Sequence, residues 1–196
     1  MAQSDEAPRP ELLALLRAHG LSAAVAARVA SVGAILHHRS LETGAEVGTT
    51  LDLATGRPIG PTLIGERDSV NFASQFAAFR PGRRYLQLHT HPGSSSFSAP
   101  DVGMLLNYPA LRTLAVVGED EHWYLLSKRA GPPTVSALEG VLRWYELWEG
   151  LATANAELIT HGRLSEEAAR VQEIHETMLR LAAELRLRYD DVGLLG

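Results

Sequence analysis

The 196-residue sequence contains no cysteine. Disulfide bonds, thiolate metal ligands and a cysteine nucleophile are therefore excluded, and any bound metal must be held by nitrogen and oxygen atoms. Positive charge is also scarce, with 18 Lys and Arg residues against 23 Asp and Glu residues and a net charge of -5. Because broad nucleic-acid binding needs a basic surface, we expect no nucleic-acid partner.

Long apolar runs are also lacking. No stretch approaches the roughly 20 apolar residues of a membrane span, and residues 1–11 contain no basic segment followed by an apolar one. We therefore expect a cytoplasmic protein with no membrane partner. The apolar content of 45% is sufficient to bury one core, which predicts one globular unit with extensions.

The spacing of apolar residues divides the chain into a helical start, a sheet-forming centre and a helical end. Helical spacing on both sides of Gly20 predicts two short N-terminal helices. The centre then predicts two hairpins, over residues 46–65 and 113–127, separated by a strand that ends at His89 and His91 and a helix over residues 98–107. We accordingly divide the chain into an N-terminal helical extension (1–34), a central α/β domain of the α+β type (35–130) and a C-terminal helical region (131–196).

Two apolar stripes mark the helices of the last third. One consists of Val135, Leu138, Leu142, Tyr145 and Trp148, and the other of Val171, Ile174, Met178, Leu181 and Leu185 in a helix that opens at Ser165. The second stripe alternates steps of three and four, which fits either packing onto the domain's own body or a homodimer seam. The stripes are expected to be core, with a groove for a partner protein as the alternative.

The chemistry-bearing pattern begins with His89 and His91. Residues two apart in a strand project from the same face, about 6.6 Å apart, so both imidazoles can converge on one ion. Asp101 follows in the first turn of the next predicted helix and can supply a third ligand. Catalytic zinc typically takes three protein ligands and leaves a fourth position for water. One Zn²⁺ per chain is therefore the expected cofactor.

A simpler interpretation also exists for each part of this pattern. An isolated HxH pair is more often structural or exposed than a ligand pair, and Ser98 with Asp101 reads as an ordinary capping box at a helix start. The combination of HxHP at a strand end, a Gly/Ser loop and SxxD at a helix start is not explained by capping, and it favours the metal site.

The segment from His89 to Asp101 resembles the JAMM, or MPN+, motif of zinc metalloproteases, in which HxHP is followed by SxxD. The resemblance covers roughly residues 35–130. It implies an MPN/JAB-like, cytidine-deaminase-like mixed sheet flanked by helices, with zinc ligands at His89, His91 and Asp101 and an oxyanion-stabilising hydroxyl at Ser98. The loop from Pro92 to Phe97 is one residue shorter than the commonest spacing in the family.

The family also places a catalytic glutamate on an early strand. We assign this role to Glu46, which opens a predicted strand, while Glu42 in an E-T-x-G arrangement is the reserve candidate and Glu66 the third. Without the downstream motif, each of these glutamates would be read as a solvated loop or edge residue. His37 and His38 are adjacent and are expected at the surface, and His122 is expected to be structural.

The resemblance implies a zinc-dependent metallopeptidase or isopeptidase that hydrolyses an amide bond in a protein tail, with the C-terminus of a ubiquitin-like protein as one substrate. One alternative is a non-catalytic MPN-fold scaffold that uses its C-terminal helices for assembly. A RadC-like role around DNA is a third interpretation, which the acidic composition does not favour.

Overall fold

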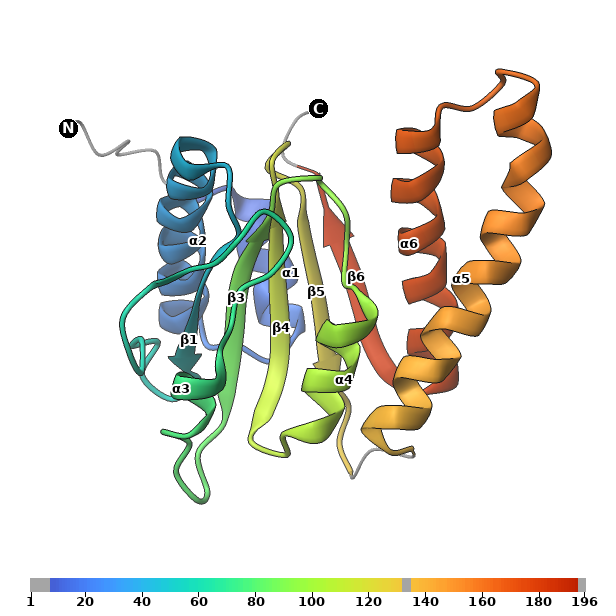
Figure 1. The fold of residues 1–196 in the computed structure, drawn as a ribbon. Coiled ribbons are helices and arrows are strands. Elements are labelled where there is room, and N and C mark those ends of the chain that lie inside the picture. The colour runs from blue at the N-terminus through green and yellow to red at the C-terminus, as the bar shows by residue number, and fades with distance from the viewer. Residues whose placement is uncertain (1–7, 132–134, 194–196) are drawn as a thin grey trace.

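The computed structural model describes residues 8–131 and 135–193, and its fold is mixed α/β with one six-stranded sheet flanked by helices (Figure 1). The helices are α1 (Pro10–Ala18), α2 (Ala23–Thr43), α3 (Ala73–Phe76), α4 (Ala99–Asn107), α5 (Ala137–Thr160) and α6 (Glu166–Glu184). The strands are β1 (Val47–Asp52), β2 (Leu63–Ile64), β3 (Tyr85–His91), β4 (Leu111–Gly118), β5 (Trp123–Lys128) and β6 (Leu187–Val192). These elements confirm the expected mixed sheet with flanking helices.

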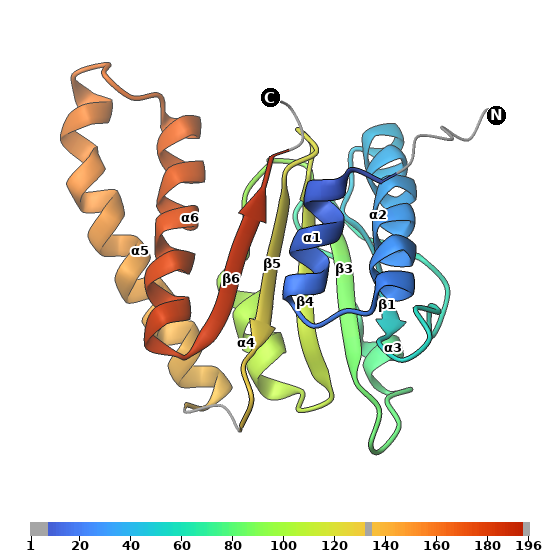
Figure 2. The same ribbon diagram turned by 180° about the vertical axis from the view of Figure 1, so that it is seen from behind.

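The strand order is β2-β1-β3-β4-β5-β6, and β3 and β4 are the only parallel neighbours in this part of the chain. Helices α1 and α2 cover one face of the sheet, whereas α3 and α4 lie on the other (Figures 1 and 2). Every residue of β3 and β5 is buried because both faces are covered. His89 and His91 therefore lie inside the protein, on the face that α4 covers.

The first two helices confirm the N-terminal prediction, although α2 is far longer than the short helix expected. Ser22 caps its start by accepting a hydrogen bond from the Val25 amide, and Gly44 ends it in the left-handed conformation with φ of 65°. The helix therefore crosses residues 34 and 35 without a break. The proposed domain boundaries stay a prediction, and residues 1–7, 132–134 and 194–196 lie outside the described part.

The first hairpin is shorter than predicted. Its second strand is limited to Leu63–Ile64, with one isolated bridge between Leu51 and Pro58. Pro58 and Pro61 lack the amide hydrogen that a strand ladder requires, which explains why the segment after the turn does not form a continuous strand. The second hairpin is confirmed by the antiparallel pairing of β4 with β5.

The prediction of a wholly helical last third was wrong. After α6 the chain returns as β6 and pairs antiparallel with β5 along its length. Only Leu187 of this edge strand is buried, because β6 forms the margin of the sheet. The period-two signal that identifies a strand is therefore weak there.

The two C-terminal stripes have different environments. Ile174, Met178, Leu181 and Leu185 of the second stripe are buried in the domain's own core, which confirms that interpretation. Three residues of the first stripe are exposed, with Leu138 67%, Leu142 54% and Tyr145 44% accessible, so their prediction as core was wrong. Val135 and Trp148 of the same stripe pack against the core. A homodimer remains a prediction. None of the described helices has the length and apolarity needed to cross a membrane.

Candidate metal centre

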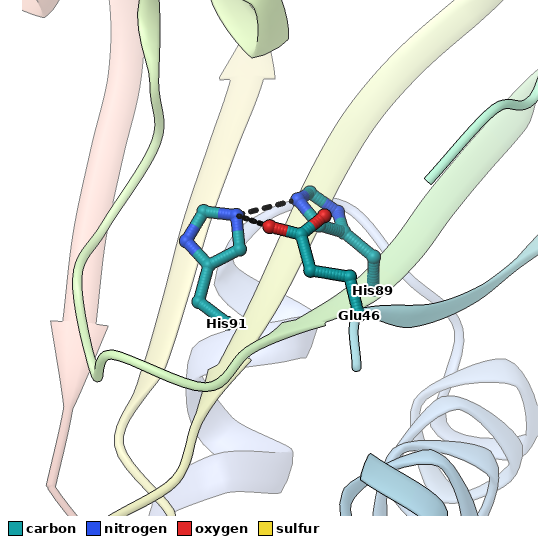
Figure 3. Close-up of side chains that lie close together, drawn as sticks. All are labelled: Glu46, His89 and His91. Carbon is teal, nitrogen blue, oxygen red and sulfur yellow. Dashed lines mark hydrogen bonds and ion pairs between the residues drawn. The ribbon is translucent and has the colours of Figure 1, made fainter. Parts of the chain in front are cut away.

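The two motif histidines lie side by side at the end of β3. Both are buried, and their Nε2 atoms are 2.9 Å apart (Figure 3). Their rings point the same way because residues 89 and 91 are separated by one full pleat of the strand. The adjacent strands β1 and β4 hold this end of β3 in register, with His89 opposite Gly48 and Val116. The predicted convergence of the two imidazoles is therefore present in the fold.

The outer nitrogen of His91 is fixed by the loop that follows the strand. Its Nδ1 donates a hydrogen bond of 2.9 Å to the carbonyl oxygen of Ser95. A neutral imidazole with its proton on Nδ1 presents an unprotonated Nε2, which is the form that binds a metal. His89 Nδ1 is buried and has no hydrogen-bond partner among the described residues. Two Nε2 atoms so close together need a proton or a cation between them.

Asp101 contacts both histidines from the first turn of α4. Its Oδ1 lies 3.4 Å from His89 Nε2, and its Oδ2 lies 3.8 Å from His91 Nε2. The carboxylate is held by Ser98, whose backbone amide and hydroxyl donate to Oδ2 over 2.8 and 2.5 Å. The amide contact, together with the Asp101 amide donating to the Ser98 hydroxyl, forms the capping box of α4. Capping and placement beside the histidines are thus properties of the same two residues.

The donor types of His89, His91 and Asp101 suit a small tetrahedral cation. Two ligands about 2.0–2.1 Å from one tetrahedral ion lie about 3.3 Å from each other. The two Nε2 atoms are 2.9 Å apart, close to this value. Asp101 approaches each histidine with a different oxygen, Oδ1 at 3.4 Å from His89 and Oδ2 at 3.8 Å from His91. Two imidazole nitrogens and a carboxylate oxygen are also ligands that Zn²⁺ accepts. The site could therefore hold a metal ion.

Glu46 belongs to the same cluster. Its carboxylate lies 3.6 Å from His91 Nε2, and one ligand atom from each of Glu46, His89 and His91 lies within 4.8 Å of the others (Figure 3). Backbone hydrogen bonds with Glu66 and Gly65 hold Glu46 just before β1. Glu46 thus completes a group of three ligand atoms with the histidines, whereas the predicted ligand Asp101 meets each histidine with a different oxygen. Both acids are candidates for the third ligand position.

The other two candidate glutamates are not part of this cluster. Glu42 lies near the end of α2, is exposed, and pairs with His38 over 3.2 Å. Glu66 is exposed, and its backbone rather than its carboxylate supports Glu46. Of the three glutamates considered from the sequence, the structure brings Glu46 to the histidines.

Burial and charge shift the pKa values of all four clustered side chains. Burial raises the pKa of Glu46 to about 7. Burial lowers the pKa of His91 to about 4, and the charge of His89 reinforces this shift. Burial alone would lower the pKa of His89, but the Asp101 carboxylate outweighs it and the pKa is raised. For Asp101, burial is outweighed by His89, and its pKa lies well below the usual value. Such mutual shifts are common at functional sites.

Two residues that sequence reasoning missed shape the site. Gly48 lies opposite His89, and a Cβ at this position would lie 2.3 Å from the ring of Phe72 and 3.0 Å from His89 Cβ. Phe72 in turn meets His89 edge to face, with ring centroids 6.1 Å apart. A glycine inside a predicted strand is the sequence signal for such a close approach.

A small cavity of about 260 Å³ adjoins the histidines on the side of α2. Among its lining residues are His91, Pro92, Arg67, His37 and Glu119. His37 is half-buried and donates from Nε2 to the Glu119 carbonyl over 3.0 Å, while His38 is exposed as expected. His37 therefore lines a cavity beside the candidate site. Its position in the sequence did not indicate this.

Comparison with known proteins gives no relative for this chain. No protein-family model, no curated protein and no solved structure matches it. The resemblance of the motif between His89 and Asp101 to zinc metalloproteases therefore rests on the motif residues alone, and the structure adds that these side chains lie close together.

Proposed function

We propose that this protein is a zinc-dependent metallopeptidase or isopeptidase of the JAMM type with an MPN/JAB-like fold. The observation that carries the proposal is the buried pair of Nε2 atoms 2.9 Å apart, with the carboxylates of Asp101 and Glu46 at 3.4 and 3.6 Å. The same proposal includes a protein or peptide tail as the substrate, with the C-terminus of a ubiquitin-like protein as one example. It also includes a cytoplasmic location.

In this proposal His89, His91 and Asp101 hold one Zn²⁺ per chain. When bound, zinc supplies a Lewis acid that polarises a carbonyl oxygen and makes water more acidic. The Ser95 carbonyl orients His91, and Ser98 orients Asp101, so the ligands are positioned before the metal arrives.

Glu46 is the proposed general base. Its carboxylate approaches the histidines from β1, whereas Asp101 approaches from α4, so the two acids reach the cluster from different elements. A base placed in this way can take a proton from attacking water and return it to the leaving amine. A glutamate held outside the ligand set keeps its lone pairs available for that transfer.

Ser98 is proposed to donate a hydrogen bond to the oxyanion. In the structure its hydroxyl donates to Asp101 Oδ2 over 2.5 Å. The role therefore requires the hydroxyl to turn away from Asp101 when substrate binds, after which the Ser98 amide still holds the carboxylate. The shortened loop before Ser98 leaves this capping arrangement intact.

The exposed stripe on α5 favours the scaffold alternative. Leu138, Leu142 and Tyr145 project into solvent at helical spacing, as expected of a surface that associates with another protein. A scaffold does not need a loaded metal or a general base, so the metal experiment separates the two functions.

The test is metal content by mass spectrometry on tag-free wild type and His91→Ala, purified without added metal. The proposal expects about one zinc per wild-type chain and its loss in the variant. Zinc-loaded protein is then assayed for cleavage of ubiquitin-like fusions. An absence of zinc from both proteins, even after reconstitution, would overturn the hydrolase proposal and leave the scaffold.

A further inference from the structure

A larger cavity, of about 580 Å³, is lined in part by Ser94 of the loop that follows β3. The rest of the lining comes from the β4–β5 turn and the neighbouring parts of β5 and β6 (Asp120, His122, Tyr124, Asp191) and from α6 with its N-cap, including Glu167 and Ala168. Its volume lies in the range of small-molecule and side-chain binding pockets.

Aromatic side chains contribute one wall of this cavity. The rings of His122 and Tyr124 stack, with centroids 4.6 Å apart and planes at 21°. His175 continues the wall at 6.4 Å from Tyr124, and its Nδ1 is fixed by the hydroxyl of Tyr189 over 2.8 Å. Flat aromatic faces attract cations, and a planar guanidinium can also stack on them.

The charge of the cavity has one sign. Three carboxylates line it, from Asp120, Asp191 and Glu167, and none of the described lining residues is a lysine or arginine. Asp191 accepts a hydrogen bond from His122 Nε2 through Oδ2 over 2.7 Å, and its other oxygen has no bond to a described residue. Asp120 Oδ1 accepts from the His122 amide. Carboxylates grouped against an aromatic wall are complementary to a cation.

The cavity and the candidate metal centre share one loop. Ser94 lines the cavity, and the next residue, Ser95, accepts the hydrogen bond that orients His91. Ser94 has an unusual φ of 50° and is held by Tyr124 donating to its carbonyl and by the Asp120 amide donating to its hydroxyl. Ser94 lies three positions after His91, a reach of at most about 11 Å along the chain.

We propose that this cavity binds an arginine side chain of a polypeptide, with the guanidinium against the aromatic wall of His122, Tyr124 and His175 and its N–H groups donating to Asp191 and Glu167. The statement that this polypeptide is the substrate rests on the proposed function. Because an extended chain advances about 3.3 Å per residue, the bound arginine lies within about four residues of the cleaved bond.

The test measures the binding of acetyl-arginine methylamide to Glu46→Gln protein. Binding is detected by the shifts of backbone amide signals in NMR spectra. Acetyl-citrulline methylamide has nearly the same shape without the charge, and acetyl-lysine methylamide has the charge without the planar group. We expect saturable shifts at residues around Tyr124 and Ala168 with arginine, weaker ones with lysine and none with citrulline. Equal shifts from arginine and citrulline, or no shifts at the cavity, would overturn the inference.

Two neighbouring glutamates provide a matched pair of variants. Glu166 and Glu167 both lie in the first turn of α6 and are exposed, but only Glu167 lines the cavity. Glu167→Gln should weaken arginine binding about threefold to fivefold, and Glu166→Gln should leave it unchanged. Equal effects of the two variants would show non-specific attraction and reject the cavity as the site.

These binding measurements do not depend on hydrolysis. Arginine binding at the cavity in a protein that contains no zinc and cleaves nothing would overturn the proposed peptidase and retain the binding site. Cleavage without arginine binding at the cavity would overturn the binding site and retain the peptidase.

Discussion

Ser98 donates its hydroxyl to Asp101 Oδ2 over 2.5 Å, and the same pair closes the first turn of α4 as a capping box. The cap turns the carboxylate so that its other oxygen lies 3.4 Å from His89 Nε2. Helix capping and metal binding were alternative interpretations of the same sequence pattern. In the fold they are compatible, because a carboxylate has two oxygens and each faces a different partner.

The roles of the two acids can be separated by substitution. We expect Glu46→Gln to retain zinc and to lose hydrolysis by about 100-fold to 10,000-fold, the usual contribution of a general base. Asp101→Ala should lose both zinc and activity. Metal content and cleavage rate are measured on the same preparations.

Glu42→Gln is the matched control for this pair, because Glu42 is exposed and lies outside the cluster. It should retain both zinc and activity. If Glu46→Gln loses zinc while Asp101→Asn keeps it, Glu46 is a metal ligand and the assignment of the two acids is reversed.

Gly48 should not tolerate a side chain. Gly48→Ala places a Cβ against Phe72 and His89, and we expect the free energy of unfolding to fall by about 1–3 kcal/mol. Gly150→Ala is the control, because a Cβ at this position of α5 meets no atom within 4 Å. It should stabilise the protein by about 0.5–1 kcal/mol through helix propensity. Urea unfolding measures both, and equal behaviour of the two variants would contradict the proposed crowding.

Gln87 should be replaceable by an apolar residue. It is fully buried on β3, and neither polar atom of its amide has a hydrogen-bond partner among the described residues. Gln87→Met should therefore raise the free energy of unfolding by about 1–3 kcal/mol. Gln75→Met is the comparison and should destabilise, because Gln75 Nε2 donates to the Pro61 carbonyl over 2.7 Å. A loss of stability in Gln87→Met would show that its amide is satisfied, for example by buried water.

His19 should make stability depend on pH. Burial lowers its pKa to about 4, although Asp190 accepts from its Nε2 over 2.9 Å and opposes the shift. Between about pH 6.5 and pH 4 the unfolded chain binds a proton at His19 that the folded chain does not. The free energy of unfolding should therefore fall as pH falls through this window, by at most about 3 kcal/mol.

His19→Gln removes this titration while keeping a polar side chain near Asp190 and Ser127. Urea unfolding at pH 7 and pH 4.5, both in EDTA, should show a smaller loss of stability in the variant than in wild type. All other titrating groups are shared, so the difference isolates His19. The same loss in both proteins would contradict the assignment to this side chain.

The sequence by itself determined the local elements that carry strong periodic or capping signals. Strand alternation predicted the end of β3 at His91, and Ser98 with Asp101 predicted the start of α4. These signals are local, because a pleat places residues 89 and 91 on one face and a cap is closed within four residues. The histidine pair and its acidic neighbour could therefore be predicted as a candidate site.

Only the tertiary structure decided which glutamate joins that site and where the chain's last strand lies. Glu46 reaches His91 because β1 pairs antiparallel with β3, whereas Glu42, four residues earlier, remains on the exposed end of α2. The edge strand β6 and the exposed stripe of α5 likewise depend on partners distant in sequence. Residue spacing specifies which side of an element a residue occupies, but contact between elements depends on how the whole chain packs.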